Sequence, residues 1–439
     1  MKAAKILGII LVVFILVVGG VLFYATRYLQ SPAFKATVLS RARSVVGAEV
    51  SIDGFDVSVL SGITLGNVKV ANPAGFAGNL LTADAFVLRY RLLPLLSKRV
   101  EIEQLSLDKA VITLTRNARG DWNYEKIGGA GEPAEPATSS APAGVPLDVT
   151  LSSLAMNHAS VVMLDEAGKV LLSLDDVNLA TSASLAGGKL SGNGKAGIKT
   201  VAVASSLFVR KLSAPVAIST DAVKLAPLDG SIAGGTVSGE AGLRLTGGTT
   251  YMADVQVKDA DIAKMIEEAG VTKKVMTGKL QLTTKLEGTG GLPTIAGSGK
   301  ASITGGQVAE IPLLNTLATL FQINALKSLK FTECVIEFTI KDNVMQTPVI
   351  RMIAPDVQIT GKGSVSLADY SLNHTMTIAF TTNSLSATPK EIRSLFSPRK
   401  DGMLTMDFKV WGPYDSPKTD LTDRLVKGAA NKLLEQFLK

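Results

Sequence analysis

Hydrophobic and polar residues alternate through most of this chain. In the stretch from Gly62 to Glu125, apolar side chains come in pairs one residue apart, such as Leu105 and Leu107. Successive side chains of a β-strand point to opposite faces, so this period of two predicts a sheet with one apolar and one polar face. The alternation continues nearly to the C-terminus. The residues predicted to line the apolar face are Ile102, Leu105, Leu107, Ile112, Leu114, Val255, Val257, Leu280, Leu282, Ile336, Phe338, Ile340, Val357, Ile359, Leu404, Met406, Phe408 and Val410.

A few segments change to helical spacing. Ser31 and Pro32 form a helix start, and apolar residues then recur every three to four positions as far as Gly47. Two short amphipathic helices are predicted at residues 261–269 and 311–326. Residues 421–439 are predicted to form a basic amphipathic helix, which either packs across the end of a sheet, the interpretation we favour, or lies on an anionic membrane surface.

The N-terminus carries an apolar run, Ile6 to Phe23, of 18 residues. This run exceeds the usual length of a signal-peptide core, and no A-x-A cleavage site follows it, which favours an uncleaved transmembrane anchor over residues 6–24. Basic residues flank the run on both sides, so charge does not decide its orientation. Because residues 1–5 are too short to be a domain, we expect them in the cytoplasm and the rest of the chain beyond the membrane.

Residues 128–146 interrupt the strand pattern. Four prolines lie there among Gly, Ala, Ser and Glu, without apolar periodicity, which is typical of a linker or surface loop. It separates a helix-and-strand region, residues 31–127, from a strand-rich body, residues 147–420.

Composition argues against several classes of function. The excess of 45 basic over 38 acidic residues is spread along the polar strand positions, unlike the concentrated basic patch of a nucleic-acid-binding protein. The single cysteine, Cys334, is predicted to be a core residue, and the two histidines, His158 and His374, are predicted to lie on the polar face. No motif for a metal, a cofactor or a catalytic nucleophile is present, so the sequence predicts a protein that is not an enzyme.

An ordered set of short motifs resembles the AsmA family. It consists of Val68-x-Val70-Ala71-Asn72-Pro73-x-Gly75, Leu92-Leu93-Pro94-Leu95-Leu96, Ile102-x-x-Leu105-x-Leu107-Asp108 and Arg116-Asn117-x-x-Gly120-x-Trp122-Asn123. Further on, Gly278-x-Leu280, Gly288-x-Gly290, Gly297-x-Gly299 and Gly361-x-Gly363 resemble the C-terminal part of that family. The motif positions outside the strands are Asn72, Pro73, Gly75, Pro94, Arg116, Asn117, Gly120, Trp122 and Asn123.

The resemblance implies an inner-membrane protein with a periplasmic body that moves phospholipid or another envelope lipid along a β-groove. The expected fold is mainly β: an elongated, curled antiparallel sheet forming an apolar groove, with an N-terminal transmembrane helix and a few short amphipathic helices. Pattern alone fits a closed β-sandwich equally well, because two apolar faces that meet also satisfy the alternation. A second functional hypothesis is a scaffold that assists outer-membrane protein assembly through contacts with envelope proteins.

Overall fold

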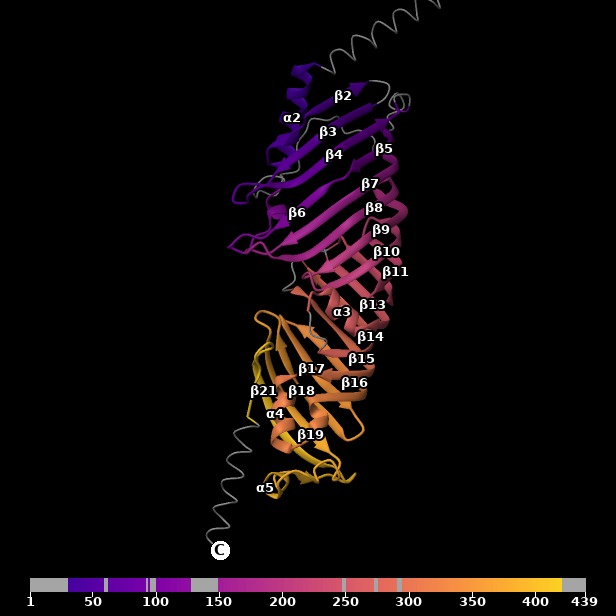
Figure 1. Ribbon diagram of the computed structural model, residues 1–439. Coiled ribbons are helices and arrows are strands. Elements are labelled where there is room, and N and C mark those ends of the chain that lie inside the picture. The colour runs from indigo at the N-terminus through magenta and orange to yellow at the C-terminus, as the bar shows by residue number, and fades with distance from the viewer. Residues whose placement is uncertain are drawn as a thin grey trace, which may run out of the picture. The chain divides into compact units, whose positions relative to one another are not determined.

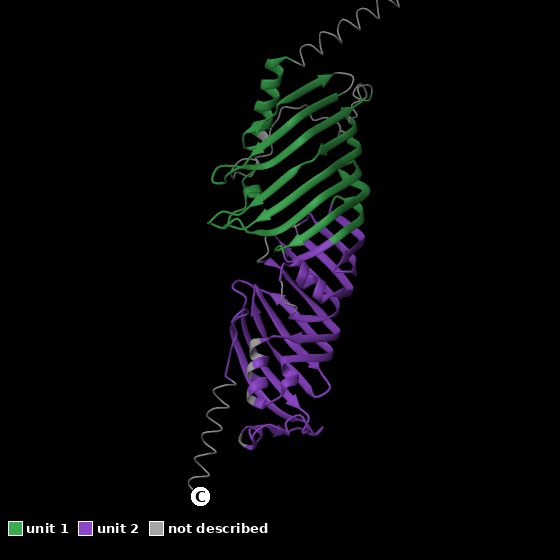
Figure 2. Ribbon diagram, in the orientation of Figure 1, with its two compact units in different colours: residues 1–205, 210–220 green, residues 206–209, 221–439 purple. Residues whose placement is uncertain are grey.

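A computed structural model describes residues 31–58, 62–91, 94, 100–127, 149–246, 250–271, 275–289 and 294–420. The chain divides into two compact units, unit 1 with residues 1–205 and 210–220, and unit 2 with residues 206–209 and 221–439 (Figure 2). The anchor, the linker and the C-terminal helix predicted from sequence, at 6–24, 128–146 and 421–439, lie outside the described residues. Among the helices that are described, none is both long and apolar enough to cross a membrane.

Unit 1 begins with helix α2, Pro32–Val46, as the sequence predicts. The Ser31 side chain accepts a hydrogen bond from the Phe34 amide, and Gly47 ends the helix in the left-handed conformation at φ 71°. The Phe34 ring lies 6.3 Å from that of Phe55, so the helix packs against the first long strand hairpin of the sheet.

The rest of unit 1 is a curled sheet (Figure 1). Its strands are β1 (Val50–Ser51), β2 (Gly54–Ser58), β3 (Gly62–Ala71), β4 (Asn79–Tyr90), β5 (Val100–Asp108), β6 (Val111–Thr115), β7 (Val149–Leu164), β8 (Val170–Ala186), β9 (Lys189–Val203) and β10 (Leu207–Ser219), with a 3-10 turn, η2, at Asn123–Lys126. β1 and β2 share one edge of β3, and β5 and β6 share one edge of β4.

One junction in this sheet is parallel, which the prediction of an antiparallel sheet did not include. β7 runs parallel to both β5 and β6, whereas β8 and β9 continue antiparallel. Two parallel strands need a crossover connection, because the chain must return to the end at which the first strand began. The connection from β6 to β7, residues 116–148, therefore serves as this crossover, and the predicted linker falls within it.

A line of left-handed residues crosses the sheet of unit 1. Asn67 in β3, Lys109 between β5 and β6, His158 in β7 and Asp176 in β8 all have φ between 49° and 53°. These residues lie side by side on neighbouring strands. Lys109 donates its amide to the Asn157 carbonyl, and Nδ1 of His158 lies 2.8 Å from the Asp176 carboxylate. The β7–β8 register shifts on both sides of Ala159, next to His158 and Asp176, as expected for a bulge. We call the line of left-handed residues the line of bulges.

The strands of unit 2 are also curled, with antiparallel pairing between consecutive long strands (Figure 1). Its strands are β11 (Ala222–Ile232), β12 (Gly235–Arg244), β13 (Thr250–Asp261), β14 (Met276–Thr289), β15 (Ala296–Ala309), β16 (Ser328–Lys341), β17 (Val344–Ile353), β18 (Val357–Ser366), β19 (Ser371–Phe380), β20 (Ser397–Pro398), β21 (Leu404–Pro413) and β22 (Lys418–Thr419). Its helices are α3 (Ile262–Glu268), α4 (Pro312–Phe321), η4 (Asn324–Lys327) and α5 (Lys390–Arg393).

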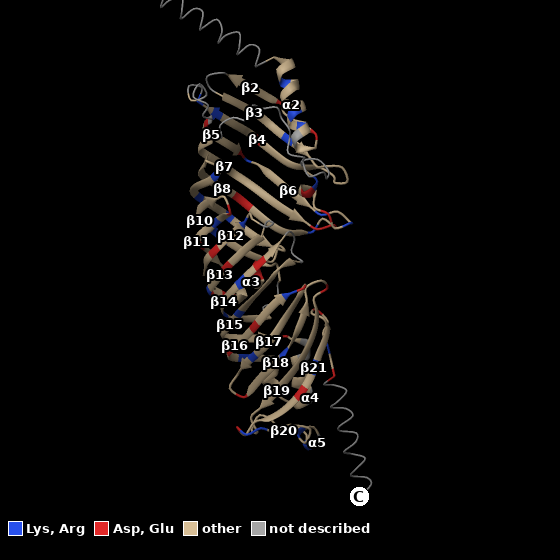
Figure 3. Cartoon of the chain, turned by 180° about the vertical axis from the view of Figure 1, so that it is seen from behind, with Lys and Arg blue, Asp and Glu red and all other residues tan. Residues whose placement is uncertain are grey.

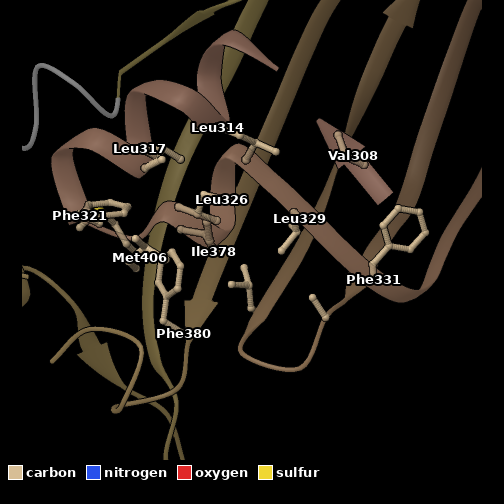
Figure 4. Close-up of a cluster of buried hydrophobic side chains, with 14 of the residues drawn as sticks. Val308, Leu314, Leu317, Phe321, Leu326, Leu329, Phe331, Ile378, Phe380 and Met406 are labelled. Carbon is tan, nitrogen blue, oxygen red and sulfur yellow. The ribbon is translucent and has the colours of Figure 1, made fainter. Parts of the chain in front are cut away.

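Both predicted helical insertions are present. Asp261 caps α3 by accepting from the Lys264 amide. The segment predicted as one helix at 311–326 is divided, because Gln322 adopts a left-handed conformation at φ 58° and ends α4 before η4 begins. Among the described residues, the largest cluster of buried side chains lies between α4, η4 and the sheet (Figure 4).

Candidate functional site

The apolar side chains of unit 2 form rows that run across the strands. In antiparallel pairing, directly opposed residues lie on the same face, so the strand register defines each row. One row, the Leu225 row, consists of Leu225, Ala241, Ala253, Leu286, Gly297, Ile340, Met345, Val365, Leu372 and Gly412. A second, the Val237 row, consists of Val237, Val257, Leu282, Ala301, Ile336, Ile350, Gly361, Met376 and Phe408. At about 4.8 Å per strand, the Leu225 row extends over roughly 40 Å.

Unit 1 has rows of the same kind. The Phe55 row consists of Phe55, Leu65, Phe86, Leu107, Met156, Leu179 and Ala196. The Val50 row consists of Val50, Val70, Leu81, Ile112, Val161, Leu174 and Val201. Leu107, Met156 and Leu81 pack on one cluster of buried alanines, so the two rows share a face across the line of bulges.

The opposite face of unit 2 is polar. Lys224 pairs with Glu240, Lys285 with Asp254 and Lys300 with Glu337, at 2.7, 2.8 and 3.0 Å. Figure 3 shows charged positions scattered along the strands of both units, without a single basic patch. Exposed pairs of this kind contribute little to stability, so this face reads as a solvated surface.

The glycines of the Gly-x-Gly motifs lie against large side chains of the neighbouring strands. A side chain at Gly299 would meet the Phe338 ring at 2.3 Å, one at Gly361 would meet Met376 at 2.2 Å, and one at Gly363 would meet His374 at 2.7 Å. Each glycine therefore leaves room for the large side chain of the neighbouring strand to lie flat across the sheet.

One polar pair interrupts the apolar face. Thr347 and His374 occupy the row between the two described above, and both are buried, with His374 7% exposed. The Thr347 Oγ1 atom lies 2.9 Å from Nε2 of His374. Burial lowers the pKa of the His374 imidazole, so the ring is neutral at neutral pH. The prediction that both histidines lie on the polar face is therefore wrong for His374.

Part of the apolar face of unit 2 is covered by the chain itself. Leu314, Leu317 and Phe321 of α4 point toward the sheet and pack with Ile378, Phe380 and Met406 (Figure 4). Phe321 stacks edge-on against Phe380 and Phe396, with ring centroids 5.6 and 5.4 Å apart. The Thr388 hydroxyl donates to the Phe321 carbonyl at 2.6 Å and ties the next loop to the end of α4.

This cover accounts for several residues that the sequence assigned to a lipid-facing surface. Val357, Met406 and Phe408 are buried in the core under α4, and Leu280, Ile359, Leu404 and Val410 pack against it. These seven side chains contact protein in the structure.

The remaining predicted residues lie in less covered parts of the rows. Val257 is buried in a smaller cluster near α3, on which Val255 and Leu282 pack. Of the other predicted residues, all are half-buried: Ile102, Leu105, Leu107, Ile112 and Leu114 in unit 1, and Ile336, Phe338 and Ile340 in unit 2. Sequence reasoning missed other members of the rows, such as Leu286 and Met345, because their local alternation is diluted by glycine, threonine and serine.

Most family-motif positions in unit 1 form a hydrogen-bonded cluster that connects the turn after β3 to the segment after β6. We call this cluster the joint. Asn123 is fully buried, accepts from the Thr115 amide at 3.1 Å, and donates to the Thr113 carbonyl and to Oδ1 of Asn72, at 2.8 and 2.7 Å. Arg116 donates to the Gly120 carbonyl, and Asn117 accepts from the Asp121 amide. Gly75 and Gly120 have φ near +90°, which only glycine adopts without strain. Pro73 and Trp122 are buried at this joint, whereas Pro94 is half-buried between undescribed neighbours.

Groups with catalytic chemistry are not assembled in the described parts of the chain. No cluster of three potential metal ligands occurs there. Cys334 is buried in the core, as predicted, and burial raises the pKa of its thiol, which disfavours the reactive thiolate. His158 lies on the surface, paired with Asp176.

These features define a class: a mainly β protein whose curled sheets each present one apolar and one polar face. Residues 1–216 match the model of the AsmA family, so this N-terminal region of the chain belongs to that family. The match does not extend to the Gly-x-Gly motifs of unit 2, for which the resemblance stays a prediction. No curated protein and no solved structure matches the chain.

Proposed function

We propose that this chain binds the acyl chains of envelope phospholipids along the apolar rows of its sheets and transfers lipid between the inner membrane and the outer parts of the envelope. The observation that carries the proposal is the continuity of half-buried aliphatic side chains across the strands, for example from Leu286 through Ile340 to Leu372. Burying each CH₂ group of an acyl chain on such a surface is favourable by about 0.8 kcal/mol.

Membership of the AsmA family supports this function and the expected location. An N-terminal anchor in the inner membrane, with both units in the periplasm, places the rows where envelope lipid is available. Transfer needs no covalent step, because an acyl chain slides along a surface whose side chains differ little in polarity. The glycines that accommodate Phe338 and Met376 keep this surface level.

Site-specific photocrosslinking in the intact chain tests the proposal. A photoreactive residue at Ile340 faces the apolar side, whereas one at the neighbouring Thr339 faces the polar side of the same strand. Leu286 and Lys285 form a second matched pair on β14. In membranes of living cells, we expect lipid adducts at Ile340 and Leu286, detected by mass spectrometry, and none at Thr339 and Lys285. Equal labelling of both faces, or no lipid adduct at any of the four positions, would refute lipid carriage.

A scaffold for envelope proteins is the second candidate, and one feature favours it. The polar face of unit 2 has a hollow of about 410 Å³ next to Met252, which is exposed between the Lys224–Glu240 and Lys285–Asp254 ion pairs. A partner protein on this face would give protein adducts at Lys285, with no lipid at Ile340. The same experiment therefore separates the two functions.

A further inference from the structure

Three exposed aromatic residues gather at one end of the strands of unit 2. Tyr370, Trp411 and Tyr414 are 55%, 40% and 66% exposed, and they are the aromatic residues among the large exposed hydrophobic side chains that the structure describes. The Tyr370 and Tyr414 rings lie 6.1 Å apart, and the Tyr414 amide donates to the Tyr370 carbonyl at 3.2 Å. Trp411 lies three residues before Tyr414 and opposite Asn373 on β19, so it lies on the polar face of these strands, one residue from Gly412 on the apolar face.

This aromatic patch adjoins the end of an apolar row. The Leu225 row terminates at Leu372 and Gly412, which are paired across β19 and β21. Leu372 is two residues from Tyr370, and Gly412 lies between Trp411 and Tyr414 in the chain. A hydrocarbon chain on that row would therefore leave the sheet next to the patch.

The composition of the patch fits a bilayer interface. Tyrosine and tryptophan combine an apolar ring with a polar group, and both concentrate at the headgroup level of membranes. Charges of both signs lie nearby: Lys409 and Lys418 are basic, and Asp369, Asp415 and Asp420 are acidic, with Asp420 accepting from the Lys409 amide. A strongly basic patch would indicate recognition of anionic lipid, and this one does not.

We infer that Tyr370, Trp411 and Tyr414 form a membrane-contact site, at which acyl chains pass between a bilayer and the Leu225 row. This inference rests on the proposed lipid function and assigns to it a point of entry or exit. Because basic residues are not in excess here, contact occurs with zwitterionic phosphatidylcholine as well as with phosphatidylglycerol and depends only weakly on salt.

The chain contains its own reporter for this contact. Of its two tryptophans, Trp122 is buried and Trp411 is exposed. The full chain is reconstituted into phosphatidylcholine vesicles in two arms, one with bromine-labelled lipid in the same vesicles and one with it in separate acceptor vesicles. We expect quenching of tryptophan emission in at least one arm, and its loss in Trp411→Phe.

Variants then assign the contact to the patch. Tyr370→Ser with Tyr414→Ser is expected to reduce the quenching of Trp411, while Val111→Ser with Leu185→Ser, at exposed aliphatic positions of unit 1, leaves it unchanged. Far-UV circular dichroism, which detects the strands of both units, reports whether each variant remains folded.

Absence of quenching in both arms overturns the inference and leaves a protein partner as the occupant of the patch. That result is independent of the lipid adducts at Ile340. If lipid adducts form but quenching is absent, only the inferred contact site is refuted. If no lipid adducts form, the proposed function itself is refuted.

Discussion

The side-chain amide of Asn123 donates a 2.7 Å hydrogen bond to Oδ1 of Asn72, joining two turns that are 51 residues apart. Both residues belong to the motifs by which the sequence resembles the AsmA family. Asn123 also satisfies the Thr115 amide and the Thr113 carbonyl of β6. The motifs of this region therefore hold the strands of unit 1 together.

Replacing Asn123 by alanine should destabilise unit 1. The substitution leaves two buried backbone groups without partners, so we expect a loss of about 1–3 kcal/mol in the free energy of unfolding, measured by chemical denaturation. Asn72→Ala should cost less, because Asn123 keeps its two backbone bonds. If the double variant loses only the sum of the two single losses, the residues are not coupled and the joint is not as described.

Replacing Gly299 by alanine should also destabilise the chain. A methyl group at Gly299 meets the Phe338 ring and the Thr283 carbonyl, and such overpacking costs about 1–3 kcal/mol. Gly197→Ala in β9 is the matched control, because nothing lies within 4 Å of the added atom. Thermal unfolding of the two variants should differ clearly, and equal melting temperatures would contradict the close approach at Gly299.

Truncating Phe321 should loosen α4. This side chain is fully buried, and Phe321→Ala is expected to cost about 3–5 kcal/mol, whereas Thr319→Ala on the exposed side of the same helix should be nearly neutral. The single native cysteine, Cys334, lies in the same core and reports the change. We expect faster thiol labelling in Phe321→Ala; unchanged labelling would mean that α4 does not shield this part of the sheet.

The buried His374 should make stability depend on pH in one direction. Burial lowers its pKa in the folded chain below the usual 6.5, so below pH 6.5 the unfolded state binds a proton more readily than the folded state. The free energy of unfolding should fall as the pH decreases from about 7 to 5, by at most about 1.4 kcal/mol per pH unit from this group. His374→Gln should remove this component of the pH dependence, and a variant that keeps the full wild-type slope would exclude His374 as its source.

Much of this fold could be predicted from local patterns. Ser31, Pro32 and Gly47 bound α2 as expected, and Asp261 caps α3, because capping depends on residues next to the helix end. The alternation of apolar residues predicted the strands correctly. It did not predict the parallel junction of β7 with β5 and β6, because strand partners depend on the path of the whole chain.

The candidate surface was predicted less completely. In the sequence, Leu105 and Leu107 form one apolar pair, and Ile112 and Leu114 form another. The left-handed residue Lys109 separates the pairs, and the local sequence does not predict this conformation. The burial of Met406 and Phe408 under α4 also depends on a contact between distant segments. Sequence alternation identifies the apolar face of a strand, but it does not identify what covers that face.

The line of bulges in unit 1 has a consequence for insertions and deletions. Leu107 and Ile112, like Met156 and Val161, are five residues apart, an odd spacing that keeps both members on one face only because a left-handed residue lies between them. Deleting Lys109 would move the side chains of β6 to the opposite face of the sheet, and deleting His158 would do the same to the following residues of β7. Their aliphatic groups would then point toward water. Strand length in this part of the protein is thereby fixed to the single residue, even where the identity of the side chains is free to drift.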